Sequence, residues 1–202
     1  MKRRFLPALA LAFAALPAVI PMGAMAAPPA NLPSESIYHL DARLHAQDGR
    51  ATTLASRRGQ VQLASMFYTS CQYICPLIID SALAVERQLT PAEKARLGVF
   101  LVSLDPKRDT PATMQRVFQR RKLDPARWAM LQPREADVRA IAGLLGIRYR
   151  ALADGEFNHT SELVLLDAQG RVLARTAKIG SVPDPEFLQA VKRALASRRV
   201  GG

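Results

Sequence analysis

Runs of apolar residues divide this chain into predicted strands. The run at 61–68 is strand-like, and the near-continuous apolar run at 97–104 is typical of a strand buried on both faces of a sheet. Turn residues at 47–50 and 167–170 each separate two short strand candidates, and this pattern predicts hairpins. The remaining strand candidates and hairpin arms occupy residues 40–44, 51–54, 128–131, 147–152, 163–166 and 172–176.

Four other segments have the three- and four-residue spacing of amphipathic helices. They occupy residues 76–89, a segment beginning at 109–111, and residues 135–145 and 185–196. Pro76 lies near the first turn of the first, and Pro111 follows a capping residue at the start of the second. Since strands and helices alternate, the sequence predicts an α/β sandwich with a central mixed sheet flanked by helices and an N-terminal β-hairpin.

The first 26 residues have the order of a secretory signal peptide. Basic residues at 2–4 precede an uncharged apolar run at 5–20, and Ala24-Met25-Ala26 is a small-x-small cleavage signature. An uncleaved membrane anchor is the alternative, but the run contains two prolines and is shorter than the about 20 residues that span a bilayer. We therefore expect a signal peptide at 1–26, a flexible leader at 27–37 and one domain at 38–202.

The chain carries a formal net charge of +11, with basic residues scattered along its length. Scattered charge is typical of a solvated surface, and it also attracts acidic partners or an anionic membrane face. No groove signature of interleaved aromatic and basic residues is present, so we expect no nucleic-acid partner.

Cys71 and Cys75 are the only cysteines, and Pro76 follows them directly. An exported protein can hold a structural disulfide, but a bridge across three residues closes too short a loop to restrict the unfolded chain much. The pair falls between the end of a predicted central strand and the start of a helix. Because a helix N-terminus favours the thiolate form, the pair is a candidate for nucleophilic or metal-binding chemistry.

Redox and metal interpretations of the pair both stay open at this point. Redox pairs usually have two intervening residues, whereas three place the sulfurs one helical turn apart on the same face. Two thiolates suit Cu(I) or Zn(II), and a third ligand is then expected. His39 and His45 have the context of ordinary surface residues, whereas His159 lies in a predicted loop just before the strand at 163–166. A Cys₂His set lacks the fourth ligand of structural zinc and suits three-coordinate copper better.

Three blocks of the sequence resemble the Sco/SenC family of copper-handling proteins. Residues 68–76 (YTSCQYICP) are similar to its cysteine motif, and residues 104–111 (LDPKRDTP) are similar to its Asp-Pro-x-Arg-Asp-Thr-Pro segment. His159-Thr160-Ser161, followed by residues 165–170, resembles its histidine segment and the hairpin after it. The resemblance runs from about residue 47 to the C-terminus. Residues 105–111 also have a sufficient structural interpretation, ending a strand and capping a helix, and we assign them no ligand role.

The resemblance implies a thioredoxin-like, peroxiredoxin-related fold with copper, Cu(I) or Cu(II), bound by Cys71, Cys75 and His159. It further implies service to the dinuclear copper centre of cytochrome c oxidase, on the outer face of the membrane. Two features depart from the family pattern. Gln72-Tyr73 stands where many members have Pro-Asp, and a cleavable signal stands where many have a transmembrane helix.

The leading hypothesis is a copper metallochaperone that delivers its ion to that centre. The alternative is an enzyme, a thiol-disulfide oxidoreductase of the export compartment, with Cys71 and Cys75 as a redox-active pair that keeps copper-acceptor cysteines reduced. Against it, no proline between Pro133 and Pro183 can supply the cis-proline of such reductases, and the pattern of a peroxidase is also missing. We expect a monomer in the periplasm or on the outer face of the cytoplasmic membrane, with the copper-centre subunit of the oxidase as partner.

Overall fold

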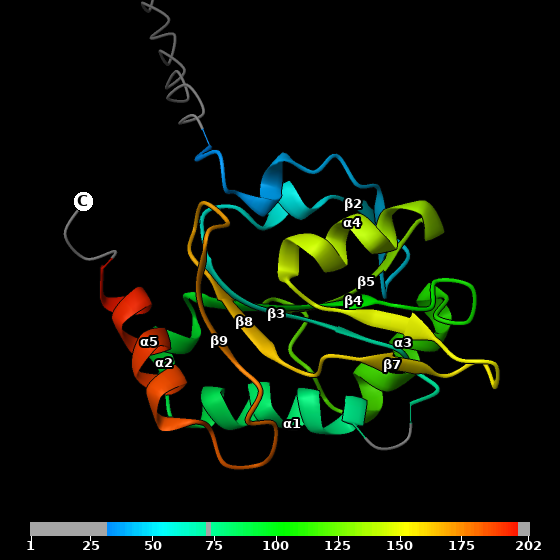
Figure 1. Cartoon of the computed structure of the whole chain (residues 1–202). Helices are drawn as coiled ribbons and strands as arrows, with labels where there is room; N and C mark the ends of the chain where they lie inside the picture. Colours follow the sequence, from blue (N-terminus) through cyan, green and yellow to red (C-terminus); the bar gives the residue numbers. More distant parts are fainter. Residues whose placement is uncertain (1–31, 72–73, 198–202) are drawn as a thin grey trace, which may run out of the picture. The chain divides into compact units, whose positions relative to one another are not determined.

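Figure 1 shows the computed structural model, which describes residues 32–71 and 74–197. The predicted signal peptide and the first part of the predicted leader lie outside the described residues. None of the helices in the described ranges combines the length and the apolar character that crossing a membrane requires.

Seven strands form the main sheet, in the spatial order β2-β1-β5-β4-β3-β8-β9. β3 pairs in parallel with β4, and β4 with β5, whereas the β3–β8 and β1–β5 pairs are antiparallel, so the sheet is mixed as predicted. The strands are β1 (Leu44–Ala46), β2 (Ala51–Thr52), β3 (Val61–Phe67), β4 (Leu97–Ser103), β5 (Trp128–Pro133), β8 (Leu163–Leu166) and β9 (Val172–Thr176). Both predicted hairpins are present, as β1–β2 and β8–β9.

Helices cover both faces of this sheet (Figure 1). α1 (Ile74–Arg87), α3 (Pro111–Arg120) and α5 (Pro185–Ala196) lie on one side, and α4 (Glu135–Leu145) lies on the other. α4 and α5 occupy the predicted residues. The N-cap of α3 is Thr110, whose side chain accepts a hydrogen bond from the Thr113 backbone N–H. A short helix, α2 (Pro91–Lys94), was not expected from the sequence.

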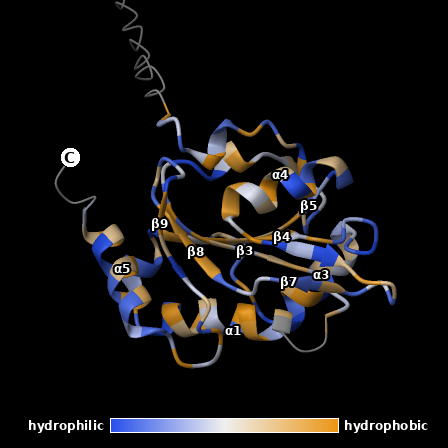
Figure 2. Cartoon of the chain, viewed as in Figure 1, coloured by the Kyte–Doolittle hydropathy of each residue, from blue (hydrophilic) through white to orange (hydrophobic). Residues whose placement is uncertain are grey.

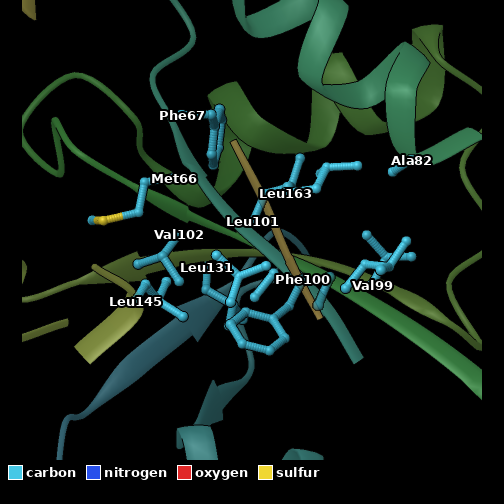
Figure 3. Packing of buried hydrophobic residues seen from close by; sticks show 14 of the residues in the cluster. Met66, Phe67, Ala82, Val99, Phe100, Leu101, Val102, Leu131, Leu145 and Leu163 are labelled. Carbon is cyan, nitrogen blue, oxygen red and sulfur yellow. The ribbon is translucent and has the colours of Figure 1, made fainter. Parts of the chain in front are cut away.

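The core lies on both faces of β3 and β4, because every residue of these two strands is buried. Figure 2 shows apolar residues along the central strands and polar residues on the outer surfaces of the helices. In Figure 3 the side chains of Phe67 and Phe100 lie on opposite sides of the strands, and Phe100 faces the side that holds Leu145 of α4. Two buried faces explain why these strands read as continuous apolar runs.

The packed domain begins earlier than the predicted leader boundary. Ser36 and Ile37, which the sequence suggested were leader, are buried, and Ile37 begins a 3₁₀ turn, η1 (Ile37–His39). The backbone N–H of Ile37 donates to the carbonyl of Gly170, at 3.1 Å. The turn of the β8–β9 hairpin thus holds the start of the domain in place.

β6 (Tyr149–Ala151) and β7 (Phe157–His159) form a separate two-stranded sheet. The sequence predicted a strand at 147–152 and a turn at Asp154-Gly155, but it placed residues 157–159 in a loop. That expectation is wrong, since His159 pairs with Tyr149 in an antiparallel ladder. A three-residue strand carries too little periodicity to be recognised without its partner.

Candidate functional site

A buried carboxylate fixes the loop that leads to the cysteines. Asp109 has no exposed surface, and its Oδ1 accepts hydrogen bonds from the backbone N–H of Thr69, at 2.9 Å, and from the Thr69 hydroxyl. Its Oδ2 accepts from the Ser103 hydroxyl at 2.5 Å. Asp109 therefore ties the segment after β3 to the end of β4. Arg108, the neighbour of Asp109, pairs with Asp105.

The two cysteines lie at the carboxyl end of β3 and in the first turn of α1, as the sequence predicts. No disulfide joins Cys71 and Cys75, and both side chains are buried. Both line the same cavity of about 330 Å³, which we call the thiol pocket. The other residues around the thiol pocket are Phe67, Tyr68, Thr69, Pro76, Ile79, Val117, Arg120 and Arg121.

Burial, rather than the helix terminus, dominates the electrostatics of Cys75. Its Sγ accepts a hydrogen bond from the backbone N–H of Tyr68 at 3.4 Å, which favours a thiolate. Removal from water outweighs that bond and raises the pKa of the Cys75 thiol, and the neighbouring Cys71 raises it further. The helix N-terminus favours the thiolate, as the sequence suggests, but burial opposes it more strongly, so the pKa of the metal-free Cys75 thiol lies above its ordinary value.

His159 presents one bare ring nitrogen in a half-buried position. Its Nδ1 lies 3.2 Å from the carbonyl oxygen of Thr160, and because a carbonyl only accepts, Nδ1 carries the proton. Nε2 then has a free lone pair, and it is buried without a hydrogen-bond partner among residues 32–71 and 74–197. Burial lowers the pKa of the His159 imidazole and so keeps the ring neutral. A neutral imidazole whose other nitrogen donates to a carbonyl is suited to bind a metal.

Tyr68 contacts both the cysteines and the histidine. Its ring meets that of His159 edge-on, with the centroids 5.8 Å apart. Its backbone N–H donates the hydrogen bond to Sγ of Cys75. Its hydroxyl donates to Oε2 of Glu156 at 2.9 Å. Burial, followed by the hydrogen bonds with Glu156 and Cys71, raises the pKa of the Tyr68 phenol. The sequence alone does not single out Tyr68; its only signal is an aromatic residue directly after the buried strand.

The structure brings the two thiols together but does not complete a three-ligand cluster. Within residues 32–71 and 74–197, no three His, Cys, Asp or Glu side chains lie close enough together to hold a metal ion. His159 instead lines a second hollow, with Arg148, Tyr149, Arg150, Asn158 and Thr160. His39 and His45 are exposed and lie outside the site, as predicted.

This mixed sheet between helices, with a cysteine pair where a central strand gives way to a helix, defines a thioredoxin-like protein with a thiol site. Within that class the chain belongs to the SCO1/SenC family, whose model matches residues 34–196. The family assignment that the three sequence blocks suggested is thereby confirmed.

Individual relatives agree with this assignment. The chain is 25% identical over 151 residues to the SCO1 protein homolog of Bacillus subtilis (strain 168), covering 73% of this chain and 78% of the relative. It is 26% identical to Bradyrhizobium japonicum ScoI, solved with copper bound, with a TM-score of 0.61 over 76% of this chain and 96% of that one. A SCO1/SenC family lipoprotein from Bacillus anthracis str. Ames, 22% identical, shares the fold with a TM-score of 0.68 over 77% and 94% of the two chains.

Proposed function

We propose that this protein is a copper metallochaperone that binds one copper ion through Cys71, Cys75 and His159. The observation that carries the proposal is the bare, buried Nε2 of His159, whose ring packs against the same tyrosine that bonds to Cys75. A buried nitrogen without a hydrogen-bond partner is costly, and a metal ion would satisfy it.

The donor set fits copper. Two thiolate sulfurs and one imidazole nitrogen are soft to intermediate ligands, which suit Cu(I) and can also accept Cu(II). Copper would replace the thiol protons, so the raised pKa of Cys75 means that loading releases protons and becomes weaker as the pH falls. The family relative from Bradyrhizobium japonicum, which was solved with copper bound, supports the choice of metal.

A shift of the β6–β7 hairpin would close the site. His159 belongs to this two-stranded sheet, which is separate from the seven-stranded sheet that carries the cysteine loop. The hairpin can therefore move toward the thiols without breaking a hydrogen bond of the main sheet. Copper would form the link between the two parts, and a partner that offers a better ligand could then remove the ion by ligand exchange.

We infer that the acceptor is a copper protein exposed to the same compartment, with the dinuclear copper site of cytochrome c oxidase as the first candidate. The predicted signal peptide at 1–26 supports export to the periplasm or to the outer face of the cytoplasmic membrane. Without Lys2, Arg3 and Arg4 of the predicted signal peptide the formal charge is +8, which still favours an acidic partner surface.

Competition between the reduced protein and a Cu(I) chelator, without oxygen, tests the proposal. We expect one tightly held Cu(I) per chain, loss of this binding in Cys71→Ser and in Cys75→Ser, and an altered Cu(II) absorption spectrum in His159→Ala. His45→Ala, at an exposed histidine of β1, is the matched control and should behave as wild type. If wild type binds Cu(I) no more tightly than a variant with both cysteines replaced by serine, copper binding at this site is refuted.

A thiol-disulfide oxidoreductase is the second candidate, because both thiols line one pocket and no disulfide joins them. In that case the metal-free protein should reduce a disulfide in the copper acceptor, and His159→Ala should leave the dithiol potential nearly unchanged. If the protein is a metallochaperone, His159→Ala should instead slow copper transfer to the acceptor. The rate at which the variant reduces the acceptor disulfide should stay the same.

A further inference from the structure

The thiol pocket has an apolar floor and a basic rim. It lies between the first turns of α1 and the C-terminal end of α3, two helices on the same side of the sheet (Figure 1). Phe67, Ile79 and Val117 supply apolar surface, and the thiols form part of the wall. A cavity of about 330 Å³ has room for a few side chains and not for a folded domain.

The two arginines at the rim differ in their partners. Arg121 forms an ion pair with Asp80 of α1, so its charge is balanced. Arg120 is exposed, and within the described residues its side chain forms no ion pair and no hydrogen bond. One uncompensated positive charge therefore stands beside an apolar cavity that ends at the sulfurs.

Access to the sulfurs is narrow. Cys71 is 9% exposed and Cys75 is 4% exposed, so neither can be reached by a flat protein surface. An incoming ligand has to enter the thiol pocket with a protruding side chain. The second hollow, at His159, does not include either cysteine among its lining residues.

We propose that the thiol pocket is the docking site for a short segment of the copper acceptor, one that carries a copper-binding side chain, an apolar neighbour and a carboxylate. The apolar neighbour packs on Phe67 and Val117, the copper-binding side chain reaches the thiols, and the carboxylate pairs with Arg120. This inference rests on the proposed function and names the face and the chemistry through which the partner is recognised.

Copper transfer to the soluble copper domain of the oxidase subunit from the same organism tests this inference. Arg120→Glu and Arg139→Glu are compared with wild type, all three loaded to equal copper content. Arg139 is an exposed arginine of α4, on the opposite side of the sheet, and its substitution changes the net charge equally. Because a rim charge acts mainly on the association rate, we expect Arg120→Glu to slow transfer about tenfold at low salt and to approach wild type at about 1 M salt.

The outcomes separate the two proposals. Equal transfer rates for Arg120→Glu and Arg139→Glu would overturn the docking site while leaving the metallochaperone intact. Failure of copper-loaded wild type to transfer any copper would instead overturn the proposed function. If sedimentation shows that wild type forms dimers and that Arg120→Glu alone abolishes them, the occupant is a second copy of this chain, and the acceptor segment is refuted.

Discussion

The ring of Tyr68 meets the imidazole of His159 edge-on, with the ring planes at 74° and the centroids 5.8 Å apart. Tyr68 follows β3 directly, whereas His159 ends β7, so this contact joins the main sheet to the small one. The Tyr68 hydroxyl adds a hydrogen bond to Glu156, one residue before β7. Tyr68 therefore positions the hairpin that carries the proposed histidine ligand.

Tyr68→Phe should weaken Cu(II) binding about tenfold. The substitution keeps the ring but removes the hydroxyl that holds Glu156, and a hydrogen bond to a charged group contributes about 1.5–3 kcal/mol. The hairpin is then less well positioned, and copper has to order it on binding. Titration followed by Cu(II) absorption measures the effect.

Tyr149→Phe is the matched control for that experiment. The Tyr149 ring also packs near Phe157, with centroids 6.3 Å apart, but its hydroxyl makes no hydrogen bond within the described residues. Equal Cu(II) affinities for the two variants would show that the Tyr68 hydroxyl has no positioning role.

Copper should raise the melting temperature of the protein. A ligand that binds only the folded state at about 100 times its Kd adds about 2.7 kcal/mol to the free energy of unfolding. We expect an upward shift in a thermal scan with Cu(I), reversed by a chelator, and a smaller shift in His159→Ala. If the melting temperature of a variant that lacks both cysteines shifts by the same amount, the ion binds at another site.

The buried carboxylate of Asp109 should make stability depend on pH. Burial raises the pKa of Asp109 above its ordinary value of 3.8, despite the hydrogen bonds from Ser103 and Thr69. A group whose pKa is raised by folding contributes stability that is complete below the unfolded pKa and is lost as the pH rises through the folded pKa. Relative to Asp109→Asn, which carries no charge, wild type should lose stability as the pH rises above 3.8.

Urea unfolding at a series of pH values measures this difference. Asp48→Asn is the control, since Asp48 is an exposed aspartate with a lowered pKa. Burial is the largest single influence and raises this pKa, but the hydrogen bonds and the charge of Arg50 together lower it by more. Relative to Asp48→Asn, wild type should not lose stability as the pH rises. Parallel pH profiles for wild type and Asp109→Asn would contradict the prediction.

Gly98→Ala should cost about 1–3 kcal/mol of stability. A Cβ at this position of β4 would lie 2.6 Å from Nε2 and 2.7 Å from Cδ of Gln62, and closer still to its Oε1. Gln62 is fully buried and bonds to Arg57 through both ends of its amide, so it has little freedom to move.

Gly143→Ala provides the comparison in chemical denaturation. A Cβ at Gly143, within α4, would meet no atom within 4 Å, and alanine is the better helix former by about 1 kcal/mol. We expect this variant to be as stable as wild type or more so. If Gly98→Ala unfolds at the same denaturant concentration as wild type, Gln62 moves aside without a loss of stability.

The arrangement of the central strands and of α4 and α5 could be predicted from the sequence because their signals are local. Residues 97–102 contain no polar side chain, and residues 135–145 keep one apolar stripe for three turns. The same local signals place Cys71 and Cys75 between a strand and a helix, and three short motifs identify the family.

Tertiary structure alone decided the environment of each site residue. The strand that holds His159 is only three residues long and exists through its pairing with β6, and the role of Tyr68 depends on contacts with residues almost 90 positions away. The raised pKa of Cys75 has the same origin. A helix N-terminus can be recognised in a sequence, but the burial that outweighs it comes from side chains that only folding brings over the sulfur.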